Sequence, residues 1–404
     1  MRPRLTAALL LAPLLATACA GTGADTRTMA RALPPDTAFT HPGVLVSEAQ
    51  LEAVKKNVTA GKQPWLKAYL DMRDSKYGAY KYRPEPYASV DCPGGDHADR
   101  PAHGCVEERE DAIAAYTQAL LFRITGKQQH AVKAREIMDA WSARMRRHTE
   151  DDAGLQTGWA GATWARAAEI VRHSPGAGWP ADRVVRFETM LRAAYLPTVT
   201  RKVPDYNGNW DLVMTDAAIG IAVFLEDRKA FEHALERFRQ RVPAYFYLAK
   251  DGRLPLTPKG STVNTPQKLT TYWFGQKTYK DGMSQETCRN FKHVGYSIAA
   301  TAHIAETAWH QGIDLYGEVK DRLKSALAFH ARYQAGETAP VWLCGGKVDR
   351  NMGPDLEVPL NHLENRLDIA VPAAHKLAEE TRPAGTDNLF VSWETLTHAG
   401  NPAS

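Results

Sequence analysis

The chain has 404 residues, of which 44% are hydrophobic and 24% are charged. That length and apolar content can bury a large core, either as one big domain or as two closely joined ones. Its 50 basic and 46 acidic residues leave a formal net charge of +4. This balance, without a run of Lys and Arg or a zinc-finger spacing, excludes nucleic acid as an expected partner.

The first 30 residues are typical of an export signal followed by a tether. A basic start (1–4) precedes an apolar run (5–15) and a stretch of small residues (16–20), which is the order of a secretory signal. The apolar run is too short to span a membrane. Cys19 follows small residues in a pattern that resembles the lipobox of bacterial lipoproteins. We therefore expect a protein outside the cytosol, anchored to the membrane only by a lipid on Cys19, with plain secretion after cleavage at Ala18 or Ala20 as the alternative.

Four cysteines remain after Cys19, an even number that suits an oxidising compartment. Cys92 and Cys105 bracket a loop rich in Gly, Pro and His, which a disulfide would close. Cys288 and Cys344 would then form a second bridge. Their spacings do not match a zinc pattern, and we predict no metal and no cofactor.

The rest of the chain alternates helical patterns with short breakers, and credible runs of strands do not interrupt them. Helices of this length joined by short turns pack as antiparallel pairs. We therefore predict an all-α fold, an incomplete α/α toroid of antiparallel helix pairs over residues 40–385. Two long loops are expected at 77–101 and 250–281, and the second is a candidate functional loop. The predicted helices are 48–59, 65–72, 107–125, 130–147, 158–173, 181–199, 210–225, 228–248, 284–311, 315–333 and 362–380.

The most informative stretch is at the start of the helix predicted for 284–311. At 100° per residue, Glu286, Arg289, His293 and Tyr296 share an arc of roughly 80°, while apolar residues occupy the opposite face. A helix face that only contacts solvent usually carries Lys and Glu rather than His and Tyr. An acid, a cation, an imidazole and a phenol on one face predict a proton-transfer site for an acidic substrate.

A second group of candidates lies in the sequence YNGNW (206–210), at the entry to a helix. Asn207 fits a simple cap or turn role equally well. Asn209 and Trp210 suit an acidic sugar better, because an amide can hydrogen-bond it, an indole can stack on it, and a helix N-terminus favours an anion.

Together these residue types fit β-elimination on a uronic acid. Hydrogen bonds from Asn209, Arg289 and a protonated Glu286 would offset the carboxylate charge and stabilise an enolate. A base then removes the C5 proton and an acid protonates the departing O4. We assign this proton shuttle to Tyr296, with His293 as its partner or co-base.

These motifs resemble a known family. The segments SQETCRNFKH (284–293) and AETAWHQGIDLY (305–316) look like the bacterial alginate lyase-type polysaccharide lyases. The helix pair at 112–141 and Asn209 with Trp210 are similar as well, so the likeness spans roughly 107–333. It implies an α/α toroid and a site in which an Asn, an Arg, a His and a Tyr neutralise the carboxylate and move protons. Asn209, Arg289 and Tyr296 match that pattern best.

Some positions depart from the family pattern. Where relatives read GRDQGH, this chain has CRNFKH (288–293), which bears on the substrate more than on the reaction. Some alginate lyases carry a His directly after the Asn, whereas Trp210 stands there in this chain. The catalytic His therefore stays open among His293, His362 and His233, of which His233 lies in an ordinary helical pattern.

Three further residues are candidates for substrate binding. His362 lies in PLNHLENR (359–366), which resembles an Asn-His-Leu-Glu element of the family, although a cap or surface role is equally plausible. Tyr272 and Trp273 lie in the long loop, where they could stack on a sugar or pack in the core.

Three functions compete at this stage. The first is an exported polysaccharide lyase that cleaves a uronate polymer, of the alginate or glucuronan type, without a metal. The second is a glycoside hydrolase on a similar toroid, with Glu286 paired with Glu364 or Asp281 as its two acids. The third is a lipid-anchored glycan-binding protein without turnover.

Overall fold

The computed structural model describes residues 32–34 and 37–401. The expected export signal and Cys19 lie outside this part of the chain. Four helices form the centre of the fold and are buried on nearly all sides: α3 (Cys105–Thr125), α5 (Ala153–His173), α8 (Gly208–Phe224) and α11 (Phe291–His310). Apolar and small residues occupy every face of these helices, as expected of helices without a solvent side. Their small side chains allow α5 and α8 to pack closely, as at Gly158 and Gly161.

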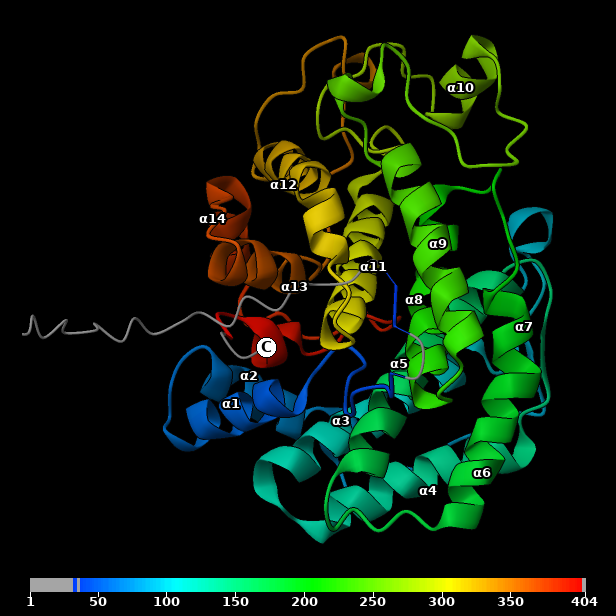
Figure 1. The fold of residues 1–404 in the computed structure, drawn as a ribbon, viewed down its shortest axis with the longest axis vertical. Coiled ribbons are helices and arrows are strands. Elements are labelled where there is room, and N and C mark those ends of the chain that lie inside the picture. The colour runs from blue at the N-terminus through cyan, green and yellow to red at the C-terminus, as the bar shows by residue number, and fades with distance from the viewer. Residues whose placement is uncertain (1–31, 35–36, 402–404) are drawn as a thin grey trace, which may run out of the picture.

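Outer helices follow each central helix in the chain and cover it (Figure 1). They are α4 (Gln128–Arg144), the pair α6 (Ala181–Met190) and α7 (Leu196–Val199), α9 (Arg228–Tyr245) and α12 (Leu315–Gln334). This alternation of inner and outer helices confirms the predicted all-α, α/α-toroid architecture. The connection from each central helix to the outer helix that follows it is short. At one of them, Gly126 ends α3 in the left-handed conformation that glycine adopts readily.

Shorter elements complete the fold. α1 (Glu48–Thr59) and α2 (Trp65–Asp74) precede the toroid, and α10 (Pro266–Tyr272) lies in the predicted long loop, apart from the helix pairs (Figure 1). The predicted loop at 77–101 contains β1 (Ser89–Asp91), which pairs in parallel with β2 (Arg147–Thr149), Ser89 opposite Arg147. Helix α4 ends at Arg144, three residues before the predicted boundary at 147, because strand β2 begins at Arg147.

Two predicted helices are wrong at their ends. The helix predicted for 284–311 begins only at Phe291, because residues 284–290 form turns that side chains hold: Thr287 Oγ1 accepts from the Ser284 backbone N–H, and Asn290 caps α11. The helix predicted for 362–380 is two pieces. A π-helical turn at Asn361–Arg366 follows α13 (Glu357–Leu360), and α14 (Pro372–Thr381) starts afresh with proline in its first turn.

The four central helices run parallel to one another. Gly154 near the start of α5 lies against Trp210 near the start of α8. Deeper in the core, Arg166 of α5 donates to Asp216 of α8 at 2.7 Å, and His303 of α11 lies 3.0 Å from the same carboxylate oxygen. The N-terminal ends of these helices therefore meet at one end of the molecule, which we call the N-terminal pole.

The C-terminal segment belongs to this core. His303 Nε2 lies 2.6 Å from Glu394 of α15 (Glu394–His398), and Phe390, Trp393 and Leu396 are buried in the main hydrophobic cluster. The predicted domain boundary at 385 is therefore too early, because it would cut through packed side chains.

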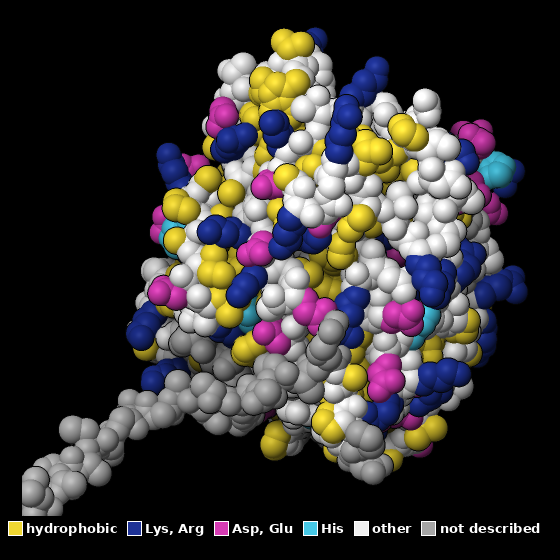
Figure 2. Space-filling model, turned by 45° about the horizontal axis from the view of Figure 1, so that its top comes forward, with side chains coloured by type: hydrophobic (Ala, Val, Ile, Leu, Met, Phe, Trp, Pro, Cys, Tyr) yellow, Lys and Arg dark blue, Asp and Glu magenta, His cyan; other side chains and the backbone are white. Residues whose placement is uncertain are grey.

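Two disulfides join the cysteines as expected, Cys92 to Cys105 and Cys288 to Cys344. Among the helices of residues 32–34 and 37–401, none is both long and apolar enough to cross a bilayer. Basic and acidic side chains are interspersed over the face drawn in Figure 2, in keeping with the nearly balanced charge.

Candidate active site

The candidate residues at the start of α8 and in the turn before α11 meet at the N-terminal pole through a buried carboxylate. Glu286 is fully buried and accepts hydrogen bonds from the Asn209 side-chain amide at 2.8 Å, from the Tyr245 hydroxyl at 3.1 Å and from Arg289 at 2.7 Å. The Asn209 backbone N–H also points to it, at 3.2 Å. Glu286 therefore positions Asn209 and Arg289, which corrects its predicted role as a protonated donor that contacts the substrate.

The neighbouring Gln285 holds the start of α8 against the same turn. Its side-chain oxygen accepts from the Gly208 backbone N–H at 2.9 Å, and its side-chain nitrogen donates to Asn207 and to the Tyr272 carbonyl. Gly208 leaves room for this approach, because a Cβ there would lie 2.0 Å from the Tyr245 ring. Asn209 and Arg289, 80 positions apart in the sequence, are thereby fixed side by side.

Arg289 is the exposed cation of the group. Its side chain is 31% exposed, and within the described chain its guanidinium makes one hydrogen bond, to Glu286. The remaining N–H donors are therefore available to a ligand. The Cys288–Cys344 disulfide anchors the residue just before it. Glu286 and Arg289 lie on the turn and not on α11, so the predicted single helical face is wrong, although the side chains it grouped do come together.

His293 is a half-buried imidazole in the first turn of α11. Its Nδ1 lies 2.6 Å from Asn290 Oδ1, which accepts the Nδ1 proton. The lone pair is then on Nε2. Burial, with Arg289 and Lys292 close by, lowers the pKa of His293 to about 4. The ring is therefore neutral at neutral pH and can accept a proton at Nε2.

Tyr296 follows His293 by one helical turn, and the two rings meet edge to face with centroids 5.8 Å apart. The Tyr296 hydroxyl is buried and has no hydrogen-bond partner among the described residues. Burial, helped by Asp387 and Asp355, raises the pKa of this phenol well above its ordinary value. Tyr296 is thus a neutral acid, and an unpaired buried hydroxyl is a feature that functional sites often show.

The surroundings of Tyr296 are more closed than those of Arg289. Tyr296 is only 3% exposed, and Phe390 of the C-terminal segment packs near its ring with centroids 6.0 Å apart. Asp387 in the same segment keeps one oxygen on three backbone N–H groups and leaves the other buried without a partner in the described chain. The C-terminal segment therefore forms one wall of the site.

Sequence reasoning missed Tyr245, Asn290 and Asp387. Tyr245 is at the end of α9, and no local pattern distinguishes it from a core tyrosine. Asn290 is a signal that could have been found, because Asn is a preferred N-cap residue and the helix starts directly after it. Asp387 precedes a turn and accepts hydrogen bonds from the backbone N–H groups of that turn. An Asp at the start of a turn is a common capping pattern, so the sequence could have suggested this role.

The sequence matches a known protein family over the region that holds this site. The alginate lyase family profile matches residues 96–340, which is more than half of the chain. The chain belongs to the alginate lyase family. It is a polysaccharide lyase, and the matched region holds Asn209, Arg289, His293 and Tyr296. Curated protein sequences give no match.

Solved structures of an alginate lyase share the fold. Alginate lyase A1-III from Sphingomonas species A1 has a TM-score of 0.61 at 18% identity, over 90% of this chain and 97% of that one. A tyrosine-to-phenylalanine variant of A1-III complexed with a tetrasaccharide has a TM-score of 0.59 at 18% identity, over 88% and 95%. A histidine-to-alanine variant in the same kind of complex also has a TM-score of 0.59, at 16% identity.

Two predicted substrate contacts of this alginate lyase-family chain lie near the pole. Trp210 is half-buried at the start of α8, edge to face with Tyr206 at 5.1 Å. The Tyr272 hydroxyl accepts from Arg241 at 3.0 Å and donates to the Tyr206 carbonyl at 2.6 Å. Trp210 is thus available to a ligand at its exposed edge, whereas the polar end of Tyr272 is engaged in holding the loop before α8.

The structure contradicts the other two. Trp273 is 1% exposed and lies in a separate hydrophobic cluster under the long loop, so it packs in the core and cannot stack on a sugar. His362 is fully buried, stacked on Tyr316 at 3.5 Å, and accepts from Arg366 beside Glu306. It belongs to a buried charge cluster far along α11 from the pole. His233 contacts the Thr200 carbonyl on an outer helix, as its ordinary pattern suggested.

Proposed function

We propose that this polysaccharide lyase cleaves a uronic-acid-containing polymer, of the alginate or glucuronan type, by β-elimination without a metal. The observation that carries the proposal is a pair of neutral groups one turn apart: His293, with its lone pair on Nε2, and Tyr296, with an unpaired hydroxyl. Both lie beside the Asn209–Glu286–Arg289 hydrogen-bond chain. The A1-III variants complexed with a tetrasaccharide support an oligosaccharide as ligand.

Arg289 binds the substrate carboxylate, and the buried Asn209 amide lies behind it on Glu286. A carboxylate beside the reacting carbon normally opposes deprotonation, because the carbanion would add charge to a group that is already negative. The guanidinium offsets that charge as the enolate forms. Glu286 supplies the rigidity, because it fixes the direction of both donors while its own charge is balanced by Arg289.

The proton transfers then follow from the states of the two groups. His293 Nε2 takes the C5 proton, and the C–H electron pair forms the C4=C5 double bond. The C4–O4 bond breaks, and O4 leaves with the proton of the Tyr296 hydroxyl. His293 returns a proton to Tyr296 after product release, so that each turnover is balanced and Tyr296 acts as the proton shuttle.

A substrate screen tests the proposal. The purified chain is incubated with polymannuronate, polyguluronate and polyglucuronate, and with a neutral glucan as control. We expect ultraviolet absorbance from the conjugated unsaturated uronate product with at least one uronan and none with the glucan. Reducing ends without that absorbance would indicate a hydrolase, and binding without either signal would indicate a non-catalytic glycan-binding protein. Both results contradict the proposal.

The competing hydrolase has little support in the arrangement of its acids. Glu286 is fully engaged as an acceptor, Glu364 pairs with His375 at 2.7 Å, and Asp281 accepts from the Ala249 backbone N–H. These three carboxylates belong to different local networks. A pair of acids facing a common groove is what hydrolysis needs.

We also propose that the protein works outside the cytosol, held to the membrane by a lipid on Cys19. The two disulfides support an oxidising compartment. Fractionation of cells that express the full chain tests this. We expect the protein in the membrane fraction and its Cys19→Ala variant outside it, and a cytosolic location of the unaltered chain would contradict the proposal.

A further inference from the structure

An open hollow of about 440 Å³ lies beside the turn that carries Arg289. Two segments far apart in the sequence form most of its walls, residues 274–278 of the long loop and residues 341–347 after α12. Figure 1 shows both segments at the same end of the molecule. Cys288 completes the lining. Because Cys288 directly precedes Arg289, with Cα atoms about 3.8 Å apart, the hollow adjoins the proposed catalytic site without being part of it.

One buried side chain fixes the two segments to each other. Gln276 is 3% exposed, and its side-chain nitrogen donates to the Trp342 carbonyl at 2.9 Å and to the Thr278 carbonyl at 2.5 Å. Its side-chain oxygen accepts from the Cys344 backbone N–H at 3.1 Å. The disulfide between Cys344 and Cys288 ties the second segment to the turn at 284–290. The walls of the hollow are therefore cross-linked, and a ligand meets a surface that is already formed.

Large apolar side chains line the hollow and remain in contact with solvent. The exposed fractions are 36% for Trp342, 38% for Phe274 and 83% for Val341. Single exposed apolar residues are common on protein surfaces, but a group of them around one hollow is typical of a binding site. The indole and phenyl rings can stack on the apolar face of a sugar ring.

Both charged side chains of this lining are positive. Lys277 and Lys347 are exposed, and neither has an ion pair within residues 32–34 and 37–401. Other lysines of the chain, such as Lys67 and Lys133, pair with a carboxylate. Two unpaired lysines beside exposed aromatic rings favour a ligand with negative charge and flat apolar faces. A polyuronate has a carboxylate and a sugar ring in every unit.

Trp342 extends this surface away from the turn. It also lines a second hollow of about 720 Å³, whose charged lining residues are Lys280, Arg332 and Asp281. Each hollow has the volume that proteins use for a small organic ligand. The two together can therefore hold more than one sugar unit, with the exposed indole between them.

We propose that the two hollows that meet at Trp342, which we call the Trp342 surface, bind units of a polyuronate chain beyond those at the cleavage site. The inference rests on the proposed function, because it takes the same polymer as the ligand. Trp342 and Phe274 stack on the sugar rings, and Lys277 and Lys347 pair with the carboxylates. This binding raises the affinity for long chains without changing the chemical step.

The dependence of the kinetics on chain length tests the proposal. Trp342→Ala and the double variant Lys277→Gln, Lys347→Gln are compared with the unaltered chain on a polyuronate and on the shortest oligouronate that is cleaved. We expect KM for the polymer to rise about 3–10-fold in each variant, with kcat unchanged. The kinetics of the short substrate should not change, because it occupies only the cleavage site. Added salt should reduce the effect of the lysine changes more than that of Trp342→Ala.

A matched control replaces two lysines elsewhere. Lys56 in α1 and Lys62 just after it are exposed and have no ion pair in the described part of the chain. Lys56→Gln with Lys62→Gln should leave KM for both substrates unchanged. If the unaltered chain and the Trp342 surface variants have equal KM for the polymer, this proposal is overturned while the proposed elimination stands.

A binding measurement separates this inference from the proposed function. If the chain cleaves none of the uronans, the proposed function fails, and electrophoresis through a gel that contains the polyuronate still tests the surface. We expect the polymer to retard the unaltered chain more than the Trp342→Ala variant, and equal retardation would overturn the proposal. A dimer that Trp342→Ala dissociates, measured by sedimentation, would show that the surface joins two copies of the chain and would also overturn it.

Discussion

At the scale of single residues, burial acts in opposite directions on the two groups that we propose to move protons. Removing charge from water lowers the pKa of the His293 imidazole and raises that of the Tyr296 phenol. Both groups are therefore neutral over a wide range of pH. A neutral base and a neutral acid, side by side, can serve a polyanionic substrate without attracting or repelling its charge.

The first prediction concerns the phenol. Tyr296→Phe removes the proton donor for O4 but keeps the ring that packs against His293 and Phe390. We expect kcat to fall by at least about 100-fold, the range that general acid catalysis contributes, while substrate binding changes little. Steady-state kinetics and equilibrium binding of an oligouronate measure the two effects. Full activity of this variant would remove Tyr296 from the mechanism.

The second prediction concerns pH. The pKa of an ordinary histidine is about 6.5, whereas burial and the nearby cations lower the pKa of His293 to about 4. Because protonation is what disables the base, activity should persist as the pH falls through 6.5 and be lost only as it falls through about 4. Lys292→Gln removes one of the nearby positive charges and should move this acid limb to higher pH. If kcat/KM of the unaltered chain already fell at a pH near 6.5, the assignment of His293 as the base would be contradicted.

The third prediction concerns the buried carboxylate. Glu286→Gln keeps the shape but replaces an acceptor with an amide that presents N–H groups to Asn209 and Arg289. We expect a lower kcat/KM and a loss of about 1–3 kcal/mol in the free energy of unfolding, from the broken buried hydrogen bonds. Glu318→Gln, in a partly exposed ion pair with Arg239, is the control and should cost less than about 1 kcal/mol. Similar losses in both variants would argue against a positioning role for Glu286.

At the scale of elements, the turn at 284–290 decides the site. It carries Glu286 and Arg289, and contacts with distant segments hold it, among them Gln285 to Gly208, the Thr287 hydroxyl to His330, and the Cys288–Cys344 disulfide. An irregular segment with this many tertiary attachments is stiffer than its backbone pattern implies. The disulfide holds the residue directly before Arg289 in the sequence.

The fourth prediction follows from that disulfide. Cys344→Ser breaks the disulfide that closes a loop of 56 residues. Chain entropy predicts that the free energy of unfolding falls by at most about 4 kcal/mol. We expect kcat/KM to fall as well, because the residue before Arg289 is released. The double variant Cys92→Ser, Cys105→Ser opens only 13 residues; it should lose about 3 kcal/mol at most and retain more activity. An equal loss of activity in the two variants would contradict the special role of the turn.

The limits of sequence reasoning are clearest in this region. Periodicity correctly predicted the long helices because their apolar faces repeat without interruption, as in α3 and α12. It failed at 284–290, where helix-compatible residues are held in turns by long-range contacts that no local window contains. The meeting of Asn209 with Arg289 was expected only through resemblance to a family. Tyr272 and Trp273 are neighbours in sequence with different surroundings, because consecutive residues point about 100° apart.

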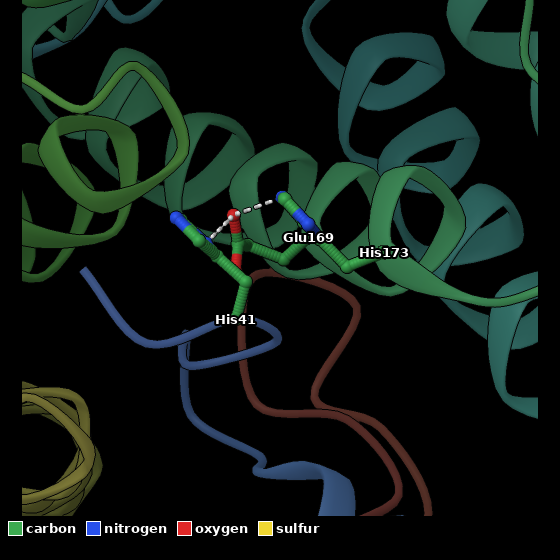
Figure 3. A group of neighbouring side chains, drawn as sticks. All are labelled: His41, Glu169 and His173. Carbon is green, nitrogen blue, oxygen red and sulfur yellow. Dashed lines mark hydrogen bonds and ion pairs between the residues drawn. The ribbon is translucent and has the colours of Figure 1, made fainter. Parts of the chain in front are cut away.

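At the scale of the whole molecule, parallel central helices separate two groups of ionisable side chains along one axis. Their N-terminal ends hold the proposed chemistry, and the far end of α5 holds Glu169 and His173 beside His41 (Figure 3). Between them lies the layer of Arg166, Asp216, His303 and Glu394. The last of these residues comes from the C-terminal segment, so the centre of the toroid is complete only with residues that a boundary at 385 would discard.

The fifth prediction tests this dependence. A chain that ends at residue 385 loses the buried side chains of Phe390, Trp393 and Leu396 and leaves His303 without Glu394. We expect it to lack a cooperative thermal transition by circular dichroism. Glu394→Gln in the full chain is milder, and its loss of a buried charged partner should cost about 3–5 kcal/mol while the transition stays cooperative. A truncated chain that melts sharply near the full-length temperature would contradict the prediction.

The position of Glu394 also bears on the order in which the protein is made. Synthesis runs from the N-terminus, so this carboxylate leaves the ribosome 91 residues after His303, the imidazole that it contacts. A nascent chain therefore cannot finish its core early. With the export that we propose, the late synthesis of Glu394 would delay completion of this core until the residues before it have crossed the membrane.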